Sequence, residues 1–492
     1  MPTLTSRDAP HKPTRVLARR TLLSFRFNTV ISVRLVDPAC GPCHHTGVSP
    51  QERHARTIID TLRAHGFSAY LAGGCVRDRL LGLEAKDFDV ATSAQAEQVL
   101  SLFPHAVPIG VQFGVVLVTS GQHVCEVATF RADGRYVDGR HPTSVRFTDA
   151  REDALRRDFT INGMFYDTAT ERVLDYVGGQ HDMAERVIRA IGDPFARFNE
   201  DHLRLLRAVR FAARLGFSIA PETFAAIRQL APTIATIAWE RIGDEVVKLL
   251  TQGGARRGFQ LLSESGLLAI VLPEIERLRG VEQSPDFHPE GDVFIHTLLL
   301  LAELDKRGAE NRPSEALALG ALLHDVAKPQ CRNQKGQRIT FYGHCEQGAE
   351  QAVAICQRLK RSRAVWQRVA YLVENHLRAL NAPAMRPAKL KRFLREEGIE
   401  ELLELVRIDA LASSGDLRPY EFCRRQQESL GPARIAPPRL LTGRDLIELG
   451  LRPGPRFKDI LTAVEDAQLE GRLASREAAL EWVRQHLEVK RP

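Results

Sequence analysis

Two patterns of hydrophobic and polar residues divide the chain. From about residue 49 to 189, short apolar runs of strand length alternate with glycines and polar turns, which predicts a small mixed sheet with a few helices. From residue 190 onward, apolar residues recur almost throughout at the three- and four-residue spacing of amphipathic helices. The sequence therefore predicts an α+β domain followed by an all-helical remainder.

Residues 1–48 follow neither pattern. They are basic and poor in acidic residues, and their apolar run Leu22–Phe27 is too short and interrupted for a signal sequence. The motif Cys40-Gly41-Pro42-Cys43-His44 matches redox and haem-attachment patterns, but no βαβ unit or export signal accompanies it. We expect a disordered extension, or translated sequence upstream of the natural start.

The stretch around Leu71 contains the first candidate chemistry. Ala69–Ala72 has the pattern of a short strand that stops at Gly73-Gly74, and Cys75–Leu81 has helical spacing. Paired glycines allow the backbone to approach phosphate oxygens closely, and Arg77 in the first helical turn can add a bidentate contact. The sequence therefore predicts a phosphate-binding turn.

A pair of carboxylates follows this turn. Asp87 and Asp89 flank Phe88 among β-forming residues, so both would face one side of a strand while Phe88 packs behind. Close carboxylates repel each other unless a cation lies between them, and oxygen ligands suit Mg²⁺. A phosphate-binding turn followed by Asp-x-Asp is typical of two-metal nucleotidyl transfer, with both aspartates catalytic. Glu126 in the next predicted strands is either a third carboxylate or a solvated strand residue.

A second polar motif follows a segment without periodicity, Arg131–Thr148, which we expect to be a loop. Arg157 can bind phosphate oxygens, and Asp158 or Asn162 can hydrogen-bond to ribose hydroxyls. An Arg-Arg-Asp triplet also occurs as a surface cluster of salt bridges. Its position after the predicted catalytic sheet favours nucleotide binding.

The segment Asn199–Phe217 has the pattern of one capped amphipathic helix that ends at Gly216. Asp201 and Arg204, three residues apart, would be neighbours on it. They form either a helix-stabilising ion pair or a base reader. In the second case, the carboxylate accepts from the amine of cytosine or adenine and the guanidinium donates to the adjacent ring nitrogen. Guanine and uracil would then leave buried polar groups unpaired, at roughly 1–3 kcal/mol each.

Together these motifs resemble the nucleotidyltransferases of the polymerase-β-like superfamily, and more closely the bacterial branch of tRNA CCA-adding enzymes and poly(A) polymerases. The resemblance rests on LAGGCVRDRLLGLEAKDFDVAT, on the Arg157 motif and on EDHLRLLRAVRFAARLGF. It implies a polymerase-β-like head and Mg²⁺-dependent addition of C, C and A to tRNA from CTP and ATP, with release of pyrophosphate. The residues that it assigns to nucleotide binding are Gly73, Gly74, Arg77, Arg157, Asp158, Asn162, Asp201, Arg204 and Arg207.

Several activities of this branch remain open. Poly(A) polymerases keep a helix like the one at 199–217, but they tend to carry a basic pair after a glycine before the second motif. Here that place reads Ile109-Gly110-Val111-Gln112-Phe113-Gly114, which favours CCA addition. The loop at 131–148 corresponds to one that takes part in the switch to adding A, which argues against addition of CC alone. A poly(A) polymerase, or an enzyme that adds only CC or only A, is the alternative.

From about residue 286, histidines and aspartates interrupt apolar helical runs. Neutral imidazoles and carboxylates together suit a divalent metal with open water positions. The order His296, His324-Asp325 and Asp409 resembles the H…HD…D pattern of HD-superfamily phosphohydrolases, with Asp416 as an alternative to Asp409. The resemblance implies that these four residues hold a divalent metal of unknown identity.

Two further histidines, His344 and His376, fit the extra histidines of some HD proteins, as metal ligands or phosphate contacts. The resemblance implies a second, hydrolytic site that acts on phosphoesters at RNA ends. An alternative from a different class is an enzyme that is mainly an HD phosphohydrolase with an RNA-binding head.

Composition agrees with a cytoplasmic RNA-binding enzyme. The net charge of +7 suits a polyanionic partner such as tRNA, and eight cysteines scattered in apolar contexts favour a reducing compartment. No run approaches the roughly 20 apolar residues of a membrane span, and no signal indicates an oligomeric state. We expect an extension at 1–48, a nucleotidyltransferase head at 49–189, a helical neck at 190–282, an HD domain at 283–425 and a tRNA-binding tail at 426–492.

Overall fold

The computed structural model describes residues 48–488, except residues 111–112, 135–143, 285–287, 309 and 337. Apart from Val48, the expected N-terminal extension and its Cys40–Cys43 motif therefore lie outside the described residues. From Ser49 onward the chain forms one unit. No helix within the described ranges is long and apolar enough to cross a membrane.

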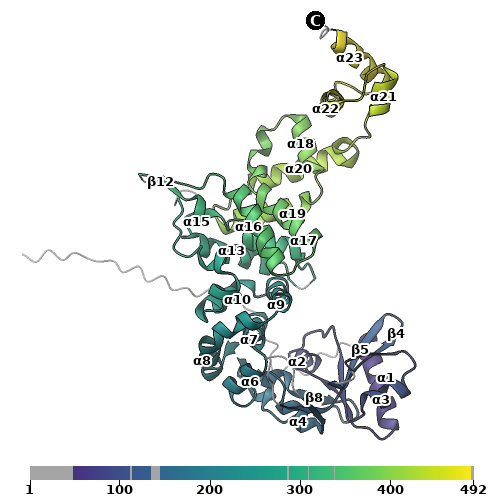
Figure 1. The fold of residues 1–492 in the computed structure, drawn as a ribbon, viewed down its shortest axis with the longest axis vertical. Helices are drawn as coiled ribbons and strands as arrows, with labels where there is room; N and C mark the ends of the chain where they lie inside the picture. Colours follow the sequence, from purple (N-terminus) through teal and green to yellow (C-terminus); the bar gives the residue numbers. More distant parts are fainter. Residues whose placement is uncertain are drawn as a thin grey trace, which may run out of the picture. The chain divides into compact units, whose positions relative to one another are not determined.

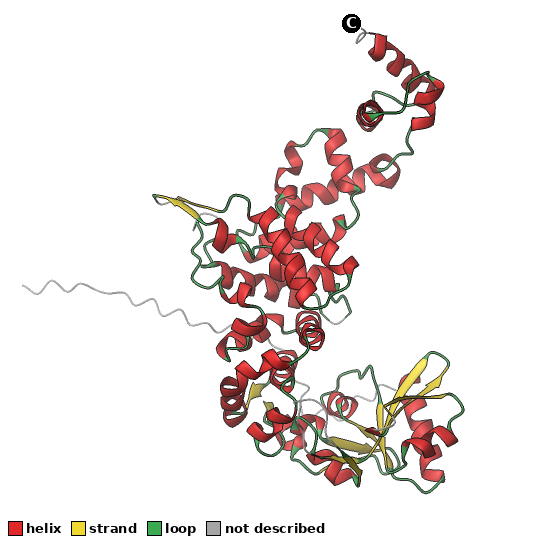
Figure 2. Cartoon of the chain, in the orientation of Figure 1, coloured by secondary structure: helices red, strands yellow, loops and turns green. Residues whose placement is uncertain are grey.

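A seven-stranded mixed sheet forms the first part of this unit (Figures 1 and 2). Its strand order is β3-β4-β5-β2-β1-β8-β9, and every neighbouring pair is antiparallel except β2 and β5. The edge strand β3 was not predicted; it contains Pro108, a residue that strands accept at an edge. The strands are β1 (Ala69–Ala72), β2 (Asp89–Thr92), β3 (Ala106–Gly110), β4 (Val115–Ser120), β5 (His123–Thr129), β8 (Met164–Asp167) and β9 (Arg172–Asp175).

Alternation along the strands places a hydrophobic layer on each face of the sheet. On β1, Leu71 belongs to the main hydrophobic core, whereas Ala72 packs with Phe130 and Phe165 in a second, smaller cluster. Helices α1 (Pro50–Ala64) and α3 (Ala96–Leu102) contact strands of the sheet, as Figure 1 shows. Helix α4 (Ala150–Leu155) contributes two alanines to the second cluster.

The prediction that residues 131–148 form a loop is wrong at both ends of the segment. Strands β6 (Arg131–Asp133) and β7 (Val145–Phe147) pair antiparallel, and the centre of the segment lies outside the described residues. Three-residue strands contain too few alternating positions for the sequence pattern to reveal them.

Helices dominate the rest of the described chain, as predicted (Figure 2). Two short sheets interrupt them: β10 (Val187–Ile188) pairs with β11 (Ser218–Ile219), and β12 (Asn333–Lys335) pairs with β13 (Arg338–Thr340). The α-helices not bounded elsewhere are α2 (Gly74–Leu80), α5 (Gly179–Ala184), α8 (Pro221–Leu230), α10 (Ala255–Glu264), α11 (Leu268–Val271), α12 (Pro273–Glu276), α15 (Lys328–Cys331), α16 (His344–Arg358), α17 (Arg363–Asn375), α18 (Pro387–Leu394), α21 (Gly443–Glu448), α22 (Pro455–Leu469) and α23 (Arg476–Glu488). The 3₁₀ helices are η2 (Thr160–Asn162), η3 (Ala231–Thr236) and η4 (Arg378–Ala384).

The hydrophobic cores divide the helical part near the end of α20 (Arg418–Ile435). One continuous core reaches from α1 to Ile435, and a separate small core around Leu446, Val464 and Val483 holds α21, α22 and α23 together. The expected boundary at 425/426 falls within α20, which is kinked at Gly431. The other domain limits stay predictions.

Candidate functional site

A cleft of about 630 Å³ brings the predicted nucleotide-binding motifs together. It is lined by the glycine turn, the carboxylate pair, the second polar motif and the start of the long helix that follows. Residues from segments more than 100 positions apart thus surround one space large enough for a nucleotide. The predicted residues that line it are Gly73, Gly74, Arg77, Asp87, Asp89, Arg157, Asp158, Asn162, Asp201, Arg204 and Arg207.

The glycine turn closes one side of the cleft. Gly73 has φ of 73°, a conformation that residues with a Cβ atom rarely adopt. A Cβ atom at this position would also lie 3.2 Å from Nη1 of Arg157. Glycine is therefore needed for the turn and for the close approach of the arginine.

Asp87 and Asp89 face the cleft, and Phe88 is buried behind them as predicted, but Asp87 and Phe88 precede the strand on which both aspartates were expected. Asp89 opens β2, whose parallel pairing with β5 places Val90 opposite Val127 and therefore Asp89 beside Glu126. Burial and the nearby carboxylate of Glu126 raise the pKa of Asp89 to about 6. Glu126, whose role the sequence left open, thus belongs to the surroundings of the carboxylate pair, and this concentration of negative charge suits a cation.

The arginines of the cleft are fixed by acceptors of the protein. Arg77 is buried, and it donates to Asp78 and, at 2.7 Å, to Oδ1 of Asn162. Arg157 donates from Nη2 to Oδ2 of Asp153 at 2.9 Å. Because both guanidinium groups have partners before any ligand arrives, their positions in the cleft wall are preorganised.

Asp158 joins the second motif to the next helix. Its Oδ2 accepts from Nη2 of Arg207 at 2.6 Å, and its Oδ1 accepts from the backbone N–H of Phe159 at 2.8 Å. Burial opposes the charge of this carboxylate, but Arg207 lowers the pKa of Asp158 to about 2. Asp158 therefore stays ionised and anchors Arg207.

The predicted helix from Asn199 to Phe217 is wrong in its first turn. Two helices cover the segment, α6 (Pro194–Glu200) and α7 (Arg204–Leu215), and Asp201 between them has extended backbone angles. The carboxylate of Asp201 accepts from the backbone N–H of Leu203 at 3.1 Å. An Asp side chain that bonds the backbone two residues ahead favours a turn over a helix, which explains the break.

This break gives Asp201 and Arg204 separate partners. Asp201 accepts from Nη2 of Arg241 at 2.8 Å and from its Nη1 at 3.3 Å. Arg204 donates to the carboxylate of Glu200 and, at 2.8 Å, to the carbonyl of Arg197. The expected contact between neighbours on one helix is therefore replaced by two independent supports. The sequence reasoning missed Arg241, which lies on α9 (Trp239–Thr251) and carries no local signal.

A second cluster forms where three helices meet. His296 lies on α13 (Val293–Asp305), His324 and Asp325 directly follow α14 (Glu315–Leu323), and Asp409 lies on α19 (Ile399–Ala412). Nε2 of His296 is 3.1 Å from Oδ1 of Asp409, and Nε2 of His324 is 3.1 Å from Oδ2 of Asp325.

Asp416, the alternative to Asp409, lies in the segment between α19 and α20 and is paired with Arg418. The structure therefore places Asp409, and not Asp416, next to His296.

The imidazole rings of the cluster are held in one orientation. In each ring Nδ1 lies within hydrogen-bond distance of an oxygen, which leaves the Nε2 lone pair available to a metal. These oxygens belong to Glu290 for His296, to the Ala321 carbonyl for His324, to the Phe341 carbonyl for His344 and to the Val373 carbonyl for His376.

The donor set fits a divalent cation. Oδ1 of Asp325 is buried and has no hydrogen-bond partner within the described residues. Burial alone would lower the pKa of His296, but Asp409 and Glu290 raise it to about 9, which reflects the excess of carboxylates. Glu290 and His288, which bond to each other, were not predicted; their only signal is their position in the stretch before His296.

A cavity of about 450 Å³ opens onto this cluster. It is lined by Asp325, His344, His376 and Asp409, and by the exposed aromatic ring of Tyr342. A ligand could therefore reach the histidines from solvent.

Comparisons with known proteins match three consecutive segments to family models. Residues 69–189 match the poly A polymerase head domain, and residues 216–278 match the probable RNA and SrmB-binding site of polymerase A. Residues 293–413 match the HD domain. The first model contains the glycine turn and the carboxylate pair, and the third contains all four predicted ligands of the histidine cluster.

Individual relatives extend this likeness over most of the chain. A CCA-adding enzyme of Geobacillus sp. (strain WCH70) is 33% identical over 431 residues, which are 87% of this chain and 95% of that protein. Poly(A) polymerase I of Salmonella typhi is 41% identical over 254 residues, which are 47% of this chain and 55% of that protein. The crystal structure of the Bacillus stearothermophilus CCA-adding enzyme in complex with CTP has a TM-score of 0.69 and 28% identity, and the match covers 90% of this chain and 99% of that one. The chain therefore belongs to the family of CCA-adding enzymes.

Proposed function

We propose that this protein adds C, C and A to the 3′ end of tRNA, using CTP and ATP and releasing pyrophosphate. The observation that carries the proposal is the gathering of all eleven predicted nucleotide-site residues around one cleft. The length of the match to a CCA-adding enzyme, 87% of this chain, supports it.

The carboxylates of Asp87 and Asp89 hold Mg²⁺, with Glu126 as the third carboxylate beside them. Bound there, Mg²⁺ would activate the RNA 3′-hydroxyl and neutralise charge on the departing pyrophosphate. Burial, and after it the carboxylate of Glu126, raise the pKa of Asp89 to about 6, and a cation bound there would offset both effects. The site is thus preorganised for the cation.

The triphosphate lies against the backbone of Gly73 and Gly74 and the guanidinium of Arg157. Arg77 is buried behind the turn and donates a hydrogen bond to Asn162. It therefore stabilises the wall of the cleft in addition to contacting the phosphates. Asn162 lines the cleft where the sugar would lie, and its amide accepts from Arg77 at 2.7 Å and donates to Asp158 at 3.2 Å.

Asp201 and Arg204 select the base. The Asp201 carboxylate accepts from the exocyclic amine of cytosine or adenine, and Arg204 donates to the adjacent ring nitrogen. Arg241 holds the carboxylate of Asp201, and Glu200 holds the guanidinium of Arg204. Because these supports are separate, the orientation of each group does not depend on the contact that the other makes with the base. Arg207, held by Asp158, completes the wall beside them.

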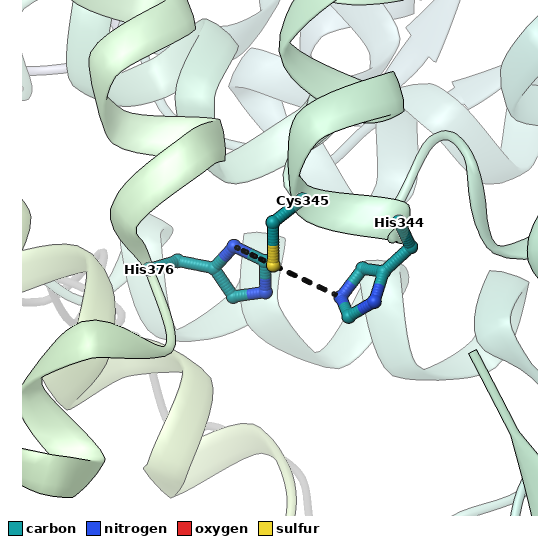
Figure 3. A group of neighbouring side chains, drawn as sticks. All are labelled: His344, Cys345 and His376. Carbon is teal, nitrogen blue, oxygen red and sulfur yellow. Dashed lines mark hydrogen bonds between the residues drawn. The ribbon is translucent and has the colours of Figure 1, made fainter. Parts of the chain in front are cut away.

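The cluster of His296, His324, Asp325 and Asp409 holds a divalent metal and hydrolyses phosphoesters at RNA ends. The imidazoles of His296 and His324, and those of His344 and His376 beside them (Figure 3), all have Nδ1 within hydrogen-bond distance of a fixed oxygen, which supports this role. The helical tail at residues 426–492 holds tRNA by phosphate contacts of its individual Lys and Arg side chains, and a cytoplasmic location agrees with this substrate.

A poly(A) polymerase is the second candidate, because a relative of that name is 41% identical over 254 residues, 47% of this chain. The absence of a basic pair after Gly110 favours CCA addition over this alternative.

The test uses tRNA that lacks its 3′ end, Mg²⁺ and each labelled nucleotide, with products separated at single-nucleotide resolution. CCA addition predicts a stop after C, C and A and a requirement for both CTP and ATP. A long ladder of A would instead establish a poly(A) polymerase, and a stop after CC or a single A would establish a partial activity. The double variant Asp87→Ala/Asp89→Ala should lose incorporation but keep phosphohydrolase activity, and His324→Ala/Asp325→Ala should do the opposite.

A further inference from the structure

The nucleotide cleft extends past the base-selecting residues Asp201 and Arg204. Helices α7 and α9 pack side by side in its wall and run in the same direction, since Asp201 before α7 bonds to Arg241 in the first turn of α9. At the other end, Gly254 beyond α9 lies against the backbone of Ala213 in the last turn of α7. With a rise of about 1.5 Å per residue, this far end of the wall lies roughly 15 Å from the base-selecting residues.

Two polar side chains at this far end contain a buried atom without a partner. Gln252 directly follows α9, and Arg312 lies between α13 and α14, within the segment that matches the HD domain. Oε1 of Gln252 and Nε of Arg312 are buried and have no hydrogen-bond partner among the described residues. Both residues line the nucleotide cleft and also a smaller cavity of about 110 Å³. Because proteins rarely bury polar atoms without partners, these two atoms point to a ligand.

Arg312 also differs from the other arginines of the cleft in its charge environment. Within the part of the chain that the structure describes, every other arginine that lines the cleft forms an ion pair with a carboxylate, whereas Arg312 forms none. The paired arginines are Arg77, Arg156, Arg157, Arg204, Arg207, Arg214 and Arg241. A partly buried guanidinium without an anion is unfavourable, because burial removes water from the charge and no carboxylate replaces it. A phosphate of the substrate can take that place through charge-assisted hydrogen bonds.

The segment that carries Arg312 is fixed by contacts on both sides. Asp305, at the end of α13, accepts from the two backbone N–H groups that begin α10, at 2.9 and 3.2 Å. Arg307 donates to the backbone carbonyl of Asn311 at 3.1 Å and to the carboxylate of Glu404 on α19. Arg312 therefore reaches the cleft from a supported backbone, which is what a preorganised binding residue requires.

We propose that Arg312 and Gln252 form a binding subsite for the growing 3′ end of the RNA. Arg312 contacts a phosphate of the RNA backbone, and Gln252 accepts from a ribose 2′-hydroxyl beside it. The incoming nucleotide has contacts of its own, because the glycine turn and Arg157 hold its triphosphate and Asp201 and Arg204 hold its base. The RNA is the second polyanion of the reaction, and its 3′-hydroxyl must enter the same cleft. The inference rests on the proposed addition of nucleotides to tRNA.

The variant Arg312→Met tests the phosphate contact in the full-length protein. Methionine is unbranched, and the substitution removes a charge that has no partner in the free protein, so Tm should not fall. Binding of tRNA that lacks its 3′ end, measured without nucleotide, should weaken roughly tenfold, a typical effect of one hydrogen bond to a charged group. The slope of log affinity against log salt concentration should become shallower by about 0.7–0.9, which corresponds to one phosphate contact. KM for CTP at saturating tRNA should not change.

The matched control is Lys306→Met. It removes a positive charge from the same segment outside the cleft, where Lys306 is exposed and pairs with Glu303. This variant should keep the affinity for tRNA and the salt slope of the wild type. Arg312→Lys should keep the salt slope and recover part of the affinity, because an ammonium has the charge but not the bidentate geometry. Gln252→Leu should lose the preference of the wild type for ribose over 2′-deoxyribose in the last nucleotides of the RNA.

A second test changes the RNA and can be read on the wild-type protein. Methylphosphonate linkages, each of which removes the charge of one phosphate, replace the last linkages before the 3′ end one at a time. The wild type should lose affinity roughly tenfold at one linkage, and Arg312→Met should be insensitive to that same linkage.

Three results would overturn the proposal. The first is a wild-type protein that no single linkage affects, and the second is an equal response of the wild type and Arg312→Met at every linkage. The third is unchanged affinity of Arg312→Met for tRNA, whether its KM for CTP and ATP rises or its Tm falls, since the arginine would then serve the nucleotide or the fold. Because binding is measured without nucleotide, a failure of CCA addition in the incorporation assay is a separate result.

Discussion

Removing Arg241 should weaken base selection without touching the metal carboxylates. Its guanidinium holds Asp201 through two contacts, at 2.8 and 3.3 Å, and both side chains remain partly exposed. Hydrogen bonds to a charged group contribute about 1.5–3 kcal/mol, and exposed ion pairs about 0–1 kcal/mol. A pair that is mostly buried but still partly exposed should therefore contribute about 1–2 kcal/mol to holding the carboxylate in the direction that the base amine requires.

That free energy corresponds to a factor of roughly 5 to 30. In Arg241→Ala, kcat/KM for CTP should fall by this factor, mainly through KM, and misincorporation of UMP relative to CMP should rise. Arg241→Lys should recover part of the discrimination, because an ammonium can replace one of the two contacts. The assay is single-nucleotide incorporation on tRNA lacking its 3′ end, with each nucleotide in turn.

The matched control is Arg257→Ala, which removes an exposed ion pair with Glu264 on a helix outside the cleft. It should leave both KM and discrimination unchanged. If Arg241→Ala has wild-type KM values and no added UMP incorporation, Asp201 does not need this support, and the orienting role is refuted.

Three further predictions follow from the same cleft. Because the folded-state pKa of Asp89 is raised to about 6, its charge destabilises the metal-free protein as pH rises from about 4 to above 6. Without Mg²⁺, Asp89→Asn should therefore have a higher Tm than the wild type at pH 8 and the same Tm at pH 4. A difference in Tm that is the same at both pH values would contradict this explanation. Arg207→Met removes the ion-pair partner of buried Asp158 and should cost about 3 kcal/mol at pH 7 in denaturant unfolding. Since the pKa of Asp158 is lowered to about 2, the stability from this pair is present above pH 4 and lost toward pH 2. The free energies of unfolding of the variant and the wild type should therefore become equal in acid. The double variant Asp158→Asn/Arg207→Met should regain stability at pH 7, because it has no buried charge to compensate. Gly73→Ala should cost about 1–2 kcal/mol of stability through backbone strain. It should also raise KM for CTP and ATP alike, because the new Cβ atom would lie 3.2 Å from Nη1 of Arg157. Unchanged KM values would show that the turn does not contact the triphosphate.

The sequence by itself determined the parts that depend on local pattern. Strand β1, the glycine turn and the alternation of Asp87, Phe88 and Asp89 could be predicted, because side-chain direction along a short extended segment follows from its period of two. The apolar face of α7 and its end at Gly216 follow in the same way from helical spacing and the positive φ of glycine. Eleven of the residues that line the cleft were therefore accessible from motifs alone, whereas Arg241 was not.

Only the tertiary structure decided which distant groups meet. The parallel register of β2 and β5 places Glu126 beside Asp89, and the break at Asp201 turns its carboxylate toward Arg241, forty residues further along. Helix packing likewise brings Cys345 next to His376. These contacts depend on strand order and on how helices pack, which no local periodicity encodes. The sequence thus determined which chemical groups the protein has, and the fold determined which of them act together.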